Sequence, residues 1–137
     1  MLQTGPSERL AISNMADIVS ARGIVRQLAG SIGFGLADQA RLATAVSELT
    51  RNVMQYAGNG FCEITDTSDI KEISIQVLVE DHGPGIGNLD KAMQDGYSTS
   101  GGLGAGLPGT RRLMDKFAVE SEPGLTRITI NLIRQRP

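Results

Sequence analysis

Two polar residues in the first half of the chain have the types and the spacing to do chemistry together. Glu48 and Asn52 stand four positions apart in a stretch that is predicted to be helical, so both side chains project from one side, a turn apart. A carboxylate in this setting can act as a general base, and an amide oxygen beside it is a hard ligand that suits Mg²⁺. A solvated polar helix face has the same pattern, and spacing alone does not separate the two interpretations.

A second candidate ends the strand predicted at 72–81. Asp81 has the parity of the apolar residues in that strand, so its carboxylate is predicted to point toward the buried layer. A buried carboxylate needs a partner. It either caps nearby backbone N–H groups or accepts a hydrogen bond from a ligand amino group, such as that of adenine. Gly83 and Gly85 would let the following backbone turn sharply and approach whatever Asp81 holds.

The third candidate is a run of glycines that leads into a predicted helix. Nine of the 17 glycines fall within 83–109, and the densest part is Gly-Gly-Leu-Gly-Ala-Gly-Leu-Pro at 101–108. Closely spaced backbone N–H groups next to a helix N-terminus make an anion site, so phosphate is the expected guest. The stretch at 104–109 formally matches the dinucleotide-binding fingerprint, but no strand precedes it, and no P-loop sequence is present.

Two residues that often carry chemistry are not expected to do so here. His82 is the only histidine and lies in a predicted loop without a partner in sequence, so a solvated side chain is expected. Cys62, the only cysteine, is expected to pack within a strand. One cysteine and one histidine exclude an internal disulfide and a Cys₄ or Cys₂His₂ zinc site, and favour a reducing cytoplasm.

The elements that must position these residues follow from hydrophobic periodicity. Helices are predicted at 15–32, with Asn14 as N-cap, and at 36–57. A shorter helix is predicted at 108–116, and strands at 8–13, 61–65, 72–81, 117–121 and 127–133. Helices that cluster beside a mixed, mostly antiparallel sheet, without alternating with its strands, favour a two-layer α+β sandwich with the helices on one face.

The composition fits one domain over 1–137. Of the 137 residues, 40% are hydrophobic and 20% charged, which is enough to bury a core. A net charge of −2 offers no basic field for nucleic acid. Neither a long apolar segment nor a basic stretch followed by an apolar run is present. We therefore expect a soluble, cytoplasmic protein with neither nucleic acid nor membrane as a partner.

Together, the order and spacing of the three motifs resemble the Bergerat, or GHKL, ATP-binding fold of gyrase, Hsp90, histidine kinases and MutL. The motifs are Glu48-x-x-x-Asn52, Asp81-x-Gly83-x-Gly85 and Gly102-x-Gly104-x-Gly106. The resemblance implies that Asn52 holds Mg²⁺ and that Asp81 binds the adenine amino group of ATP. It further implies nucleotide contacts by the rest of the two glycine motifs, namely Gly83, Gly85, Ile86, Gly102, Leu103, Gly104, Ala105, Gly106 and Leu107.

An ATP lid is expected at about 84–107. Thr126, in Gly124-Leu125-Thr126, resembles the family's late Gly-Thr element near adenine, with Leu125 as a departure from that pattern. Since one domain accounts for the chain, the similarity favours the stand-alone anti-sigma-factor type of serine/threonine protein kinase.

This type implies a mechanism. Glu48 would take the proton from a Ser or Thr hydroxyl of a STAS-domain stressosome scaffold protein while the γ-phosphate of Mg·ATP is transferred in line. Once released, the kinase would bind and activate a downstream PP2C-type phosphatase in a sigma-factor partner-switching pathway. Two alternatives stay open: a nucleotide-gated binding module with little phosphotransfer, and an anti-sigma factor that sequesters a sigma subunit.

Overall fold

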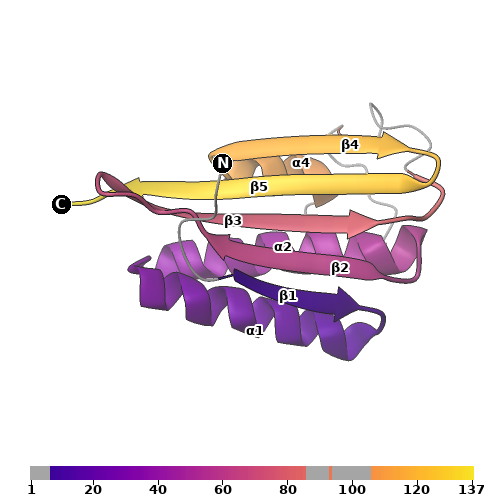
Figure 1. Ribbon diagram of the computed structural model, residues 1–137, viewed down its shortest axis with the longest axis horizontal. Coiled ribbons are helices and arrows are strands. Elements are labelled where there is room, and N and C mark those ends of the chain that lie inside the picture. Colours follow the sequence, from indigo (N-terminus) through magenta and orange to yellow (C-terminus); the bar gives the residue numbers. More distant parts are fainter. Residues whose placement is uncertain (1–6, 86–92, 94–105) are drawn as a thin grey trace.

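Five antiparallel strands form one sheet in the order β1-β2-β3-β5-β4 in a computed structural model that describes residues 7–85, 93 and 106–137. The elements are β1 (Ser7–Ile12), α1 (Met15–Ile32), α2 (Leu36–Tyr56), β2 (Gly60–Asp66), β3 (Glu72–Asp81), α4 (Gly106–Leu113), β4 (Lys116–Glu122) and β5 (Leu125–Gln135). Figure 1 shows α2 and α4 behind the strands, with α1 beside α2 and near β1. The predicted two-layer α+β sandwich is confirmed.

The two long helices begin where the sequence predicts. Asn14 caps α1, since its side-chain oxygen accepts a hydrogen bond from the Asp17 N–H at 3.0 Å, and Asp17 in turn accepts from the Ser13 N–H at 2.9 Å. Gly33, at φ 124°, ends α1 in a conformation that favours glycine. No helix of the described residues is long and apolar enough to cross a membrane.

An apolar stripe fixes the rotation of α2 against the sheet. It consists of four residues that are at most 1% exposed: Leu42, Val46, Leu49 and Val53. They meet buried residues that pair across β3 and β5, among them Val77 with Ile130 and Val79 with Ile128. Full burial of each such side chain is worth about 1.5–3 kcal/mol. This packing sets Glu48 and Asn52 at the edge of the stripe, and it sets Asp81 at the end of the buried face of β3.

The predicted helix at 108–116 is shifted toward the N-terminus. It begins at Gly106 and ends at Leu113, because the Asp115 N–H donates to the backbone oxygen of Asn131 at 3.0 Å and the chain turns into the sheet. Pro108 lies in the first turn of α4, where a missing N–H costs nothing. The last strand is longer than predicted, since β5 pairs with β3 along the whole of β3.

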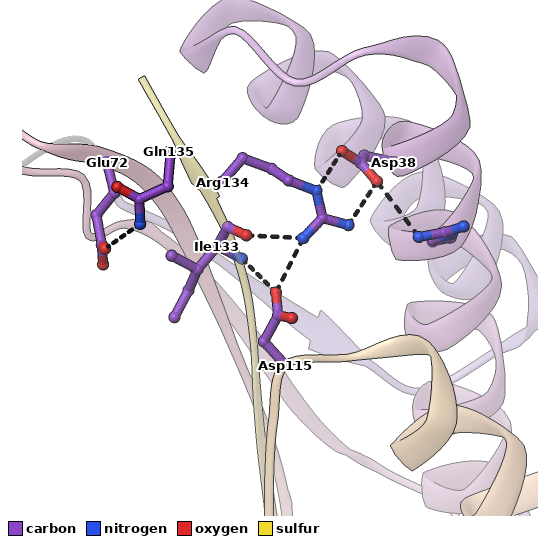
Figure 2. A network of polar contacts seen from close by, with 7 residues as sticks. Asp38, Glu72, Asp115, Ile133, Arg134 and Gln135 are labelled. Atoms are coloured by element: carbon purple, nitrogen blue, oxygen red, sulfur yellow. Dashed lines mark hydrogen bonds and ion pairs between the residues drawn. The ribbon is translucent and has the colours of Figure 1, made fainter. Parts of the chain in front are cut away.

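A charged network closes the end of the molecule that lies away from Asp81 (Figure 2). The Arg134 guanidinium of β5 donates to both carboxylate oxygens of Asp38, in the first turn of α2, each at 2.9 Å. It also donates to Asp115, just after α4, at 3.1 Å, and to the backbone oxygen of Ile133 at 2.7 Å. One side chain thus joins the start of α2, the end of α4 and the sheet.

Candidate functional site

Glu48 lies buried on α2 and faces the start of α4. Its side chain is only 7% exposed. One carboxylate oxygen, Oε2, accepts from the Arg51 guanidinium at 2.7 Å, and the other, Oε1, lies 3.3 Å from the backbone N–H of Gly106. A solvated polar face therefore does not describe this residue. The geometry joins the predicted base to the first residue of the helix that follows the glycine-rich run.

Asn52 lies one helical turn beyond Glu48 and is half-buried. Its amide nitrogen is shielded from water and has no hydrogen-bond partner among the described residues. A buried donor without a partner costs free energy, so we expect this nitrogen to meet an acceptor that lies outside the described residues, such as a ligand oxygen. The nitrogen is a donor, so a Mg²⁺ ion would take the amide oxygen of Asn52 instead, as one of the few protein ligands that this ion has besides phosphate oxygens and water.

Asp81 ends β3 with its carboxylate pointing into the buried layer, as its parity predicts. Burial raises the pKa of this carboxyl above its ordinary value, an effect that the backbone N–H of Gly83 partly offsets. That N–H donates to Oδ1 at 3.0 Å, which is the capping interaction that the sequence left as one alternative. The second carboxylate oxygen has no hydrogen bond within the described residues, so a donor from a ligand can use it.

Thr126 lies directly opposite Asp81, on the same face of the sheet. The two residues pair across β3 and β5, and Thr126 is buried with its hydroxyl 3.1 Å from that of Ser121. The intervening Leu125 does not disturb this placement. It is the first residue of β5 and pairs with Glu122, so the tight turn consists of the two residues between them. The departure from the family pattern thus leaves Thr126 beside Asp81.

The glycines after β3 are needed for contacts between protein segments. A Cβ on Gly83 would lie 2.6 Å from that of Ala57, at the end of α2. Gly85 has φ 88°, and a Cβ there would lie 2.6 Å from the backbone oxygen of Glu122. The backbone oxygen of Gly83 also accepts from the Gly124 N–H at 2.9 Å. This turn therefore packs between α2 and the β4–β5 hairpin. That packing explains why glycine is needed at both positions, and sequence spacing does not predict it.

Gly60, the first residue of β2, lies between α2 and the end of β3. A Cβ on Gly60 would lie 3.0 Å from Val53, which follows Asn52, and 3.1 Å from the Cβ of Asp81. Val53 of α2 and Asp81 of β3 thus come close to each other at Gly60, and Glu48 meets the start of α4 at Gly106. Leu107, in the first turn of α4, is buried in the core. Five predicted positions lie outside the described residues: Ile86, Gly102, Leu103, Gly104 and Ala105.

Two contacts near the site were not predicted. His82 is exposed as expected, but its Nε2 lies 2.9 Å from Glu80, which the sequence analysis did not consider as a partner. Burial raises the pKa of Glu80, but hydrogen bonds from Arg127 and His82 outweigh it, and the pKa lies below its ordinary value. Arg51 was also missed as the partner of Glu48, although oppositely charged residues three apart on a helix are a recognisable signal.

Comparison with known proteins places this geometry in a family. The model of the histidine kinase-like ATPase domain matches residues 12–132, which include every described residue of the site. The chain belongs to this family. The resemblance predicted from the three motifs is thereby confirmed.

Relatives within the histidine kinase-like ATPase family narrow the assignment. The chain is 52% identical over 108 residues to the serine/threonine-protein kinase RsbT of Bacillus subtilis, covering 79% of this chain and 81% of that protein. It is 33% identical over 123 residues to an anti-sigma F factor of Caldanaerobacter subterraneus, covering 85% and 86%. At this level of identity to RsbT, the chain is a member of the serine/threonine protein kinases of the family, as predicted.

Solved structures share the fold at low sequence identity. The RsbU and RsbW domains of a Mycobacterium tuberculosis protein match with a TM-score of 0.69 and 16% identity, over 96% of this chain and 33% of that one. This chain thus spans a third of that larger protein. A chain of the SiaB-SiaC complex of Pseudomonas aeruginosa has a TM-score of 0.56 and 11% identity, over 93% of this chain and 89% of that one. These likenesses support the fold.

Proposed function

We propose that the chain is a Mg·ATP-dependent kinase that transfers the γ-phosphate to a Ser or Thr hydroxyl of a STAS-domain protein. The observation that carries this proposal is the placement of Glu48. Its buried carboxylate faces the N-terminus of α4. Asn52, whose amide nitrogen has no partner among the described residues, follows one helical turn later. A base, a candidate Mg²⁺ ligand and a helix N-terminus suited to phosphate therefore lie together.

In this proposal the adenine end of the nucleotide is bound at the ends of β3 and β5. The second oxygen of Asp81 accepts a hydrogen bond from the adenine amino group, and Thr126 lies beside it. Gly83 and Gly85 hold the turn that borders this position. We further propose that Ile86 contacts the nucleotide and that Gly102 to Leu107 close over the phosphates, within an ATP lid at about 84–107 that lies mostly outside the described residues.

The phosphate end is handled by α2 and α4. Asn52 would hold Mg²⁺, which when bound neutralises charge on the phosphates. The dipole of α4 favours an anion near the start of that helix, where the Gly106 N–H itself faces Glu48. Glu48 accepts the proton of the attacking hydroxyl, since its carboxylate is buried where water cannot compete for the acceptor.

The partners follow from similarity to RsbT. We infer that the acceptors are STAS-domain stressosome scaffold proteins of the RsbS and RsbR type. A released kinase then binds and activates an RsbU-type PP2C phosphatase in a sigma-factor partner-switching pathway. The 33% identity to an anti-sigma F factor supports this setting. We propose one kinase domain over 1–137 that works in the cytoplasm, where its phosphoryl donor is abundant.

Mass spectrometry of a STAS-domain protein after incubation with the chain and Mg·ATP tests the proposal. We expect the acceptor to gain one phosphate on a Ser or Thr. Glu48→Gln, which keeps the size of the side chain and an acceptor for Gly106, should bind ATP in calorimetry but transfer phosphate roughly 10²- to 10⁴-fold more slowly.

The same samples separate the alternatives. Wild-type protein that binds ATP but adds no phosphate to any STAS-domain protein would overturn the kinase proposal and favour a nucleotide-gated binding module. Co-elution with a sigma subunit in the presence of nucleotide would favour an anti-sigma factor. Full activity of Glu48→Gln would place the base elsewhere.

A further inference from the structure

Arg51 follows Glu48 by three positions on α2 and belongs to none of the three motifs. We propose that Arg51 is a positioning residue that fixes the Glu48 carboxylate against α4, in the orientation from which it takes the proton of the acceptor hydroxyl. The inference rests on the proposed function, because it takes Glu48 as the base. Arg51 would then affect phosphate transfer only by orienting Glu48.

The two contacts of the Glu48 carboxylate differ in strength. The Arg51 contact, at 2.7 Å, is a short, charge-assisted hydrogen bond, and such bonds are roughly twice as strong as neutral ones. The Gly106 contact, at 3.3 Å, is longer than an ordinary N–H···O bond. Arg51 therefore determines where the carboxylate lies, and the start of α4 only completes the arrangement.

Burial of Glu48 makes the position of its carboxylate depend on this ion pair. The Glu48 side chain is 7% exposed, whereas that of Arg51 is 34% exposed, so the carboxylate depends on the pair more than the guanidinium does. A buried carboxylate that loses its cation turns toward water wherever rotamers allow. For Glu48 such a turn moves Oε1 away from Gly106 and away from the position from which it can act as a base.

A second arginine on the same helix provides a matched control. Arg41 also pairs with a carboxylate three residues away, but its nitrogen lies 3.7 Å from the Asp38 oxygen and its side chain is half-exposed. Removing Arg41 deletes the same number of atoms and the same charge from α2 without touching Glu48. Any effect that Arg51→Ala has beyond Arg41→Ala thus reports on the Glu48 pair.

The first test needs neither nucleotide nor acceptor. In ¹H–¹⁵N correlation spectra of the full chain, we expect the Gly106 amide signal to move in Arg51→Ala, to stay near its wild-type position in Arg51→Lys, and to be unaffected in Arg41→Ala. A Gly106 signal that Arg51→Ala leaves unchanged would show that Arg51 does not position Glu48. This readout does not depend on the chain being a kinase.

The second test uses transfer to a STAS-domain acceptor. Arg51→Ala should lower kcat at least about 10-fold, within the loss caused by Glu48→Gln, while the Kd for ATP changes by less than about threefold. Arg51→Lys should restore most of kcat. In the Glu48→Gln background, Arg51→Ala should lower kcat by less than about twofold, because its effect runs through Glu48. That double variant also lacks the unpaired buried charge, so it covers the case in which Arg51→Ala alone unfolds.

Independent losses in the double variant would overturn the inference, because they would mean that Arg51 acts without Glu48. A large rise in the Kd for ATP would do the same, since it would make Arg51 a nucleotide-binding residue. If wild-type protein transfers no phosphate, the proposed function fails, and the Gly106 signal still decides whether Arg51 orients the carboxylate.

Discussion

The two ends of the sheet both gather charged and polar side chains, but only one end completes its hydrogen bonds. At the Arg134 end, all three guanidinium nitrogens donate, and Asp38 accepts at both carboxylate oxygens (Figure 2). At the Asp81 end, one carboxylate oxygen and the buried amide nitrogen of Asn52 have no partner among the described residues. Since buried polar groups are nearly always satisfied, we expect a ligand at the Asp81 end, whereas the Arg134 end is a structural joint.

The electrostatics of the two ends differ in the same sense. Hydrogen bonds from its guanidinium to Asp38 raise the pKa of Arg134, so the protein itself favours the charged form there. Burial raises the pKa of Asp81, so the protein disfavours the charged form of that carboxylate in the absence of a ligand. A group held at a cost where a ligand is expected is typical of functional sites.

The largest effect that we expect from this comparison is the loss of nucleotide binding in Asp81→Asn. The amide replaces an acceptor oxygen with a donor, which repels the adenine amino group, and a hydrogen bond to a charged partner is worth about 1.5–3 kcal/mol. Affinity for ATP in calorimetry should fall about 10- to 100-fold, with no loss of thermal stability because the variant removes a buried charge.

Asp115→Asn, at the other end of the sheet, serves as the matched control. It should leave ATP affinity unchanged and lower the unfolding temperature, since it weakens the contacts to Arg134 and to the Ile133 N–H. Equal ATP affinity of Asp81→Asn and wild-type protein would remove Asp81 from the site and break the comparison.

The incomplete end was the one that the sequence revealed. Glu48, Asn52 and Asp81 are polar residues placed by helical spacing or strand parity beside apolar patterns, and such placement is a local property that can be counted along the chain. The same holds for the start of α1, because a cap lies within three residues of its partner. Local periodicity thus predicted the elements and the described core of the candidate site.

Contacts between distant segments were beyond the sequence. Arg134 and Asp38 are 96 positions apart, and Glu48 and Gly106 are 58 apart. No spacing rule links such pairs, because their meeting depends on the order of strands and on which helix covers which strand. The reason for Gly83 was equally hidden, since the atoms that exclude a side chain there belong to Ala57 on another element.

A smaller effect is expected from Arg134→Ala, which should weaken folding and leave binding alone. Its four side-chain hydrogen bonds go to two carboxylates and a carbonyl, which would all lose this donor. The side chain is about one third exposed, so water screens part of the loss. We expect the free energy of unfolding in urea to fall by about 1–3 kcal/mol.

Arg41→Ala is the control, because it removes a half-exposed arginine with a longer contact to the same aspartate. It should change unfolding by less than about 0.5 kcal/mol. If Arg134→Ala had wild-type stability but reduced ATP affinity, the Arg134 end would contribute to binding and not to folding, which contradicts the comparison.

The smallest effect is a pH dependence of nucleotide affinity that comes from Asp81. The ionised carboxylate of Asp81 accepts a hydrogen bond from the adenine amino group, and a protonated oxygen can no longer accept it. The affinity for ATP is therefore full above the pKa of Asp81 and falls as the pH is lowered through that pKa. Because burial raises the pKa of Asp81, this loss should start at higher pH than for an ordinary aspartate, and it cannot exceed tenfold per pH unit.

Calorimetry between pH 7.5 and pH 5, compared between wild-type protein and Asp81→Asn, isolates this contribution, since the phosphates of the nucleotide titrate alike in both. His82 and Glu80 lie next to Asp81 in the chain and contact each other, so His82→Asn is needed as a second comparison. We expect His82→Asn to keep the acid loss and Asp81→Asn to lack it. If Asp81→Asn also lost ATP affinity at low pH, the group responsible for the pH dependence would not be Asp81. The distinction between the two ends would then rest on Asn52 and Glu48 alone.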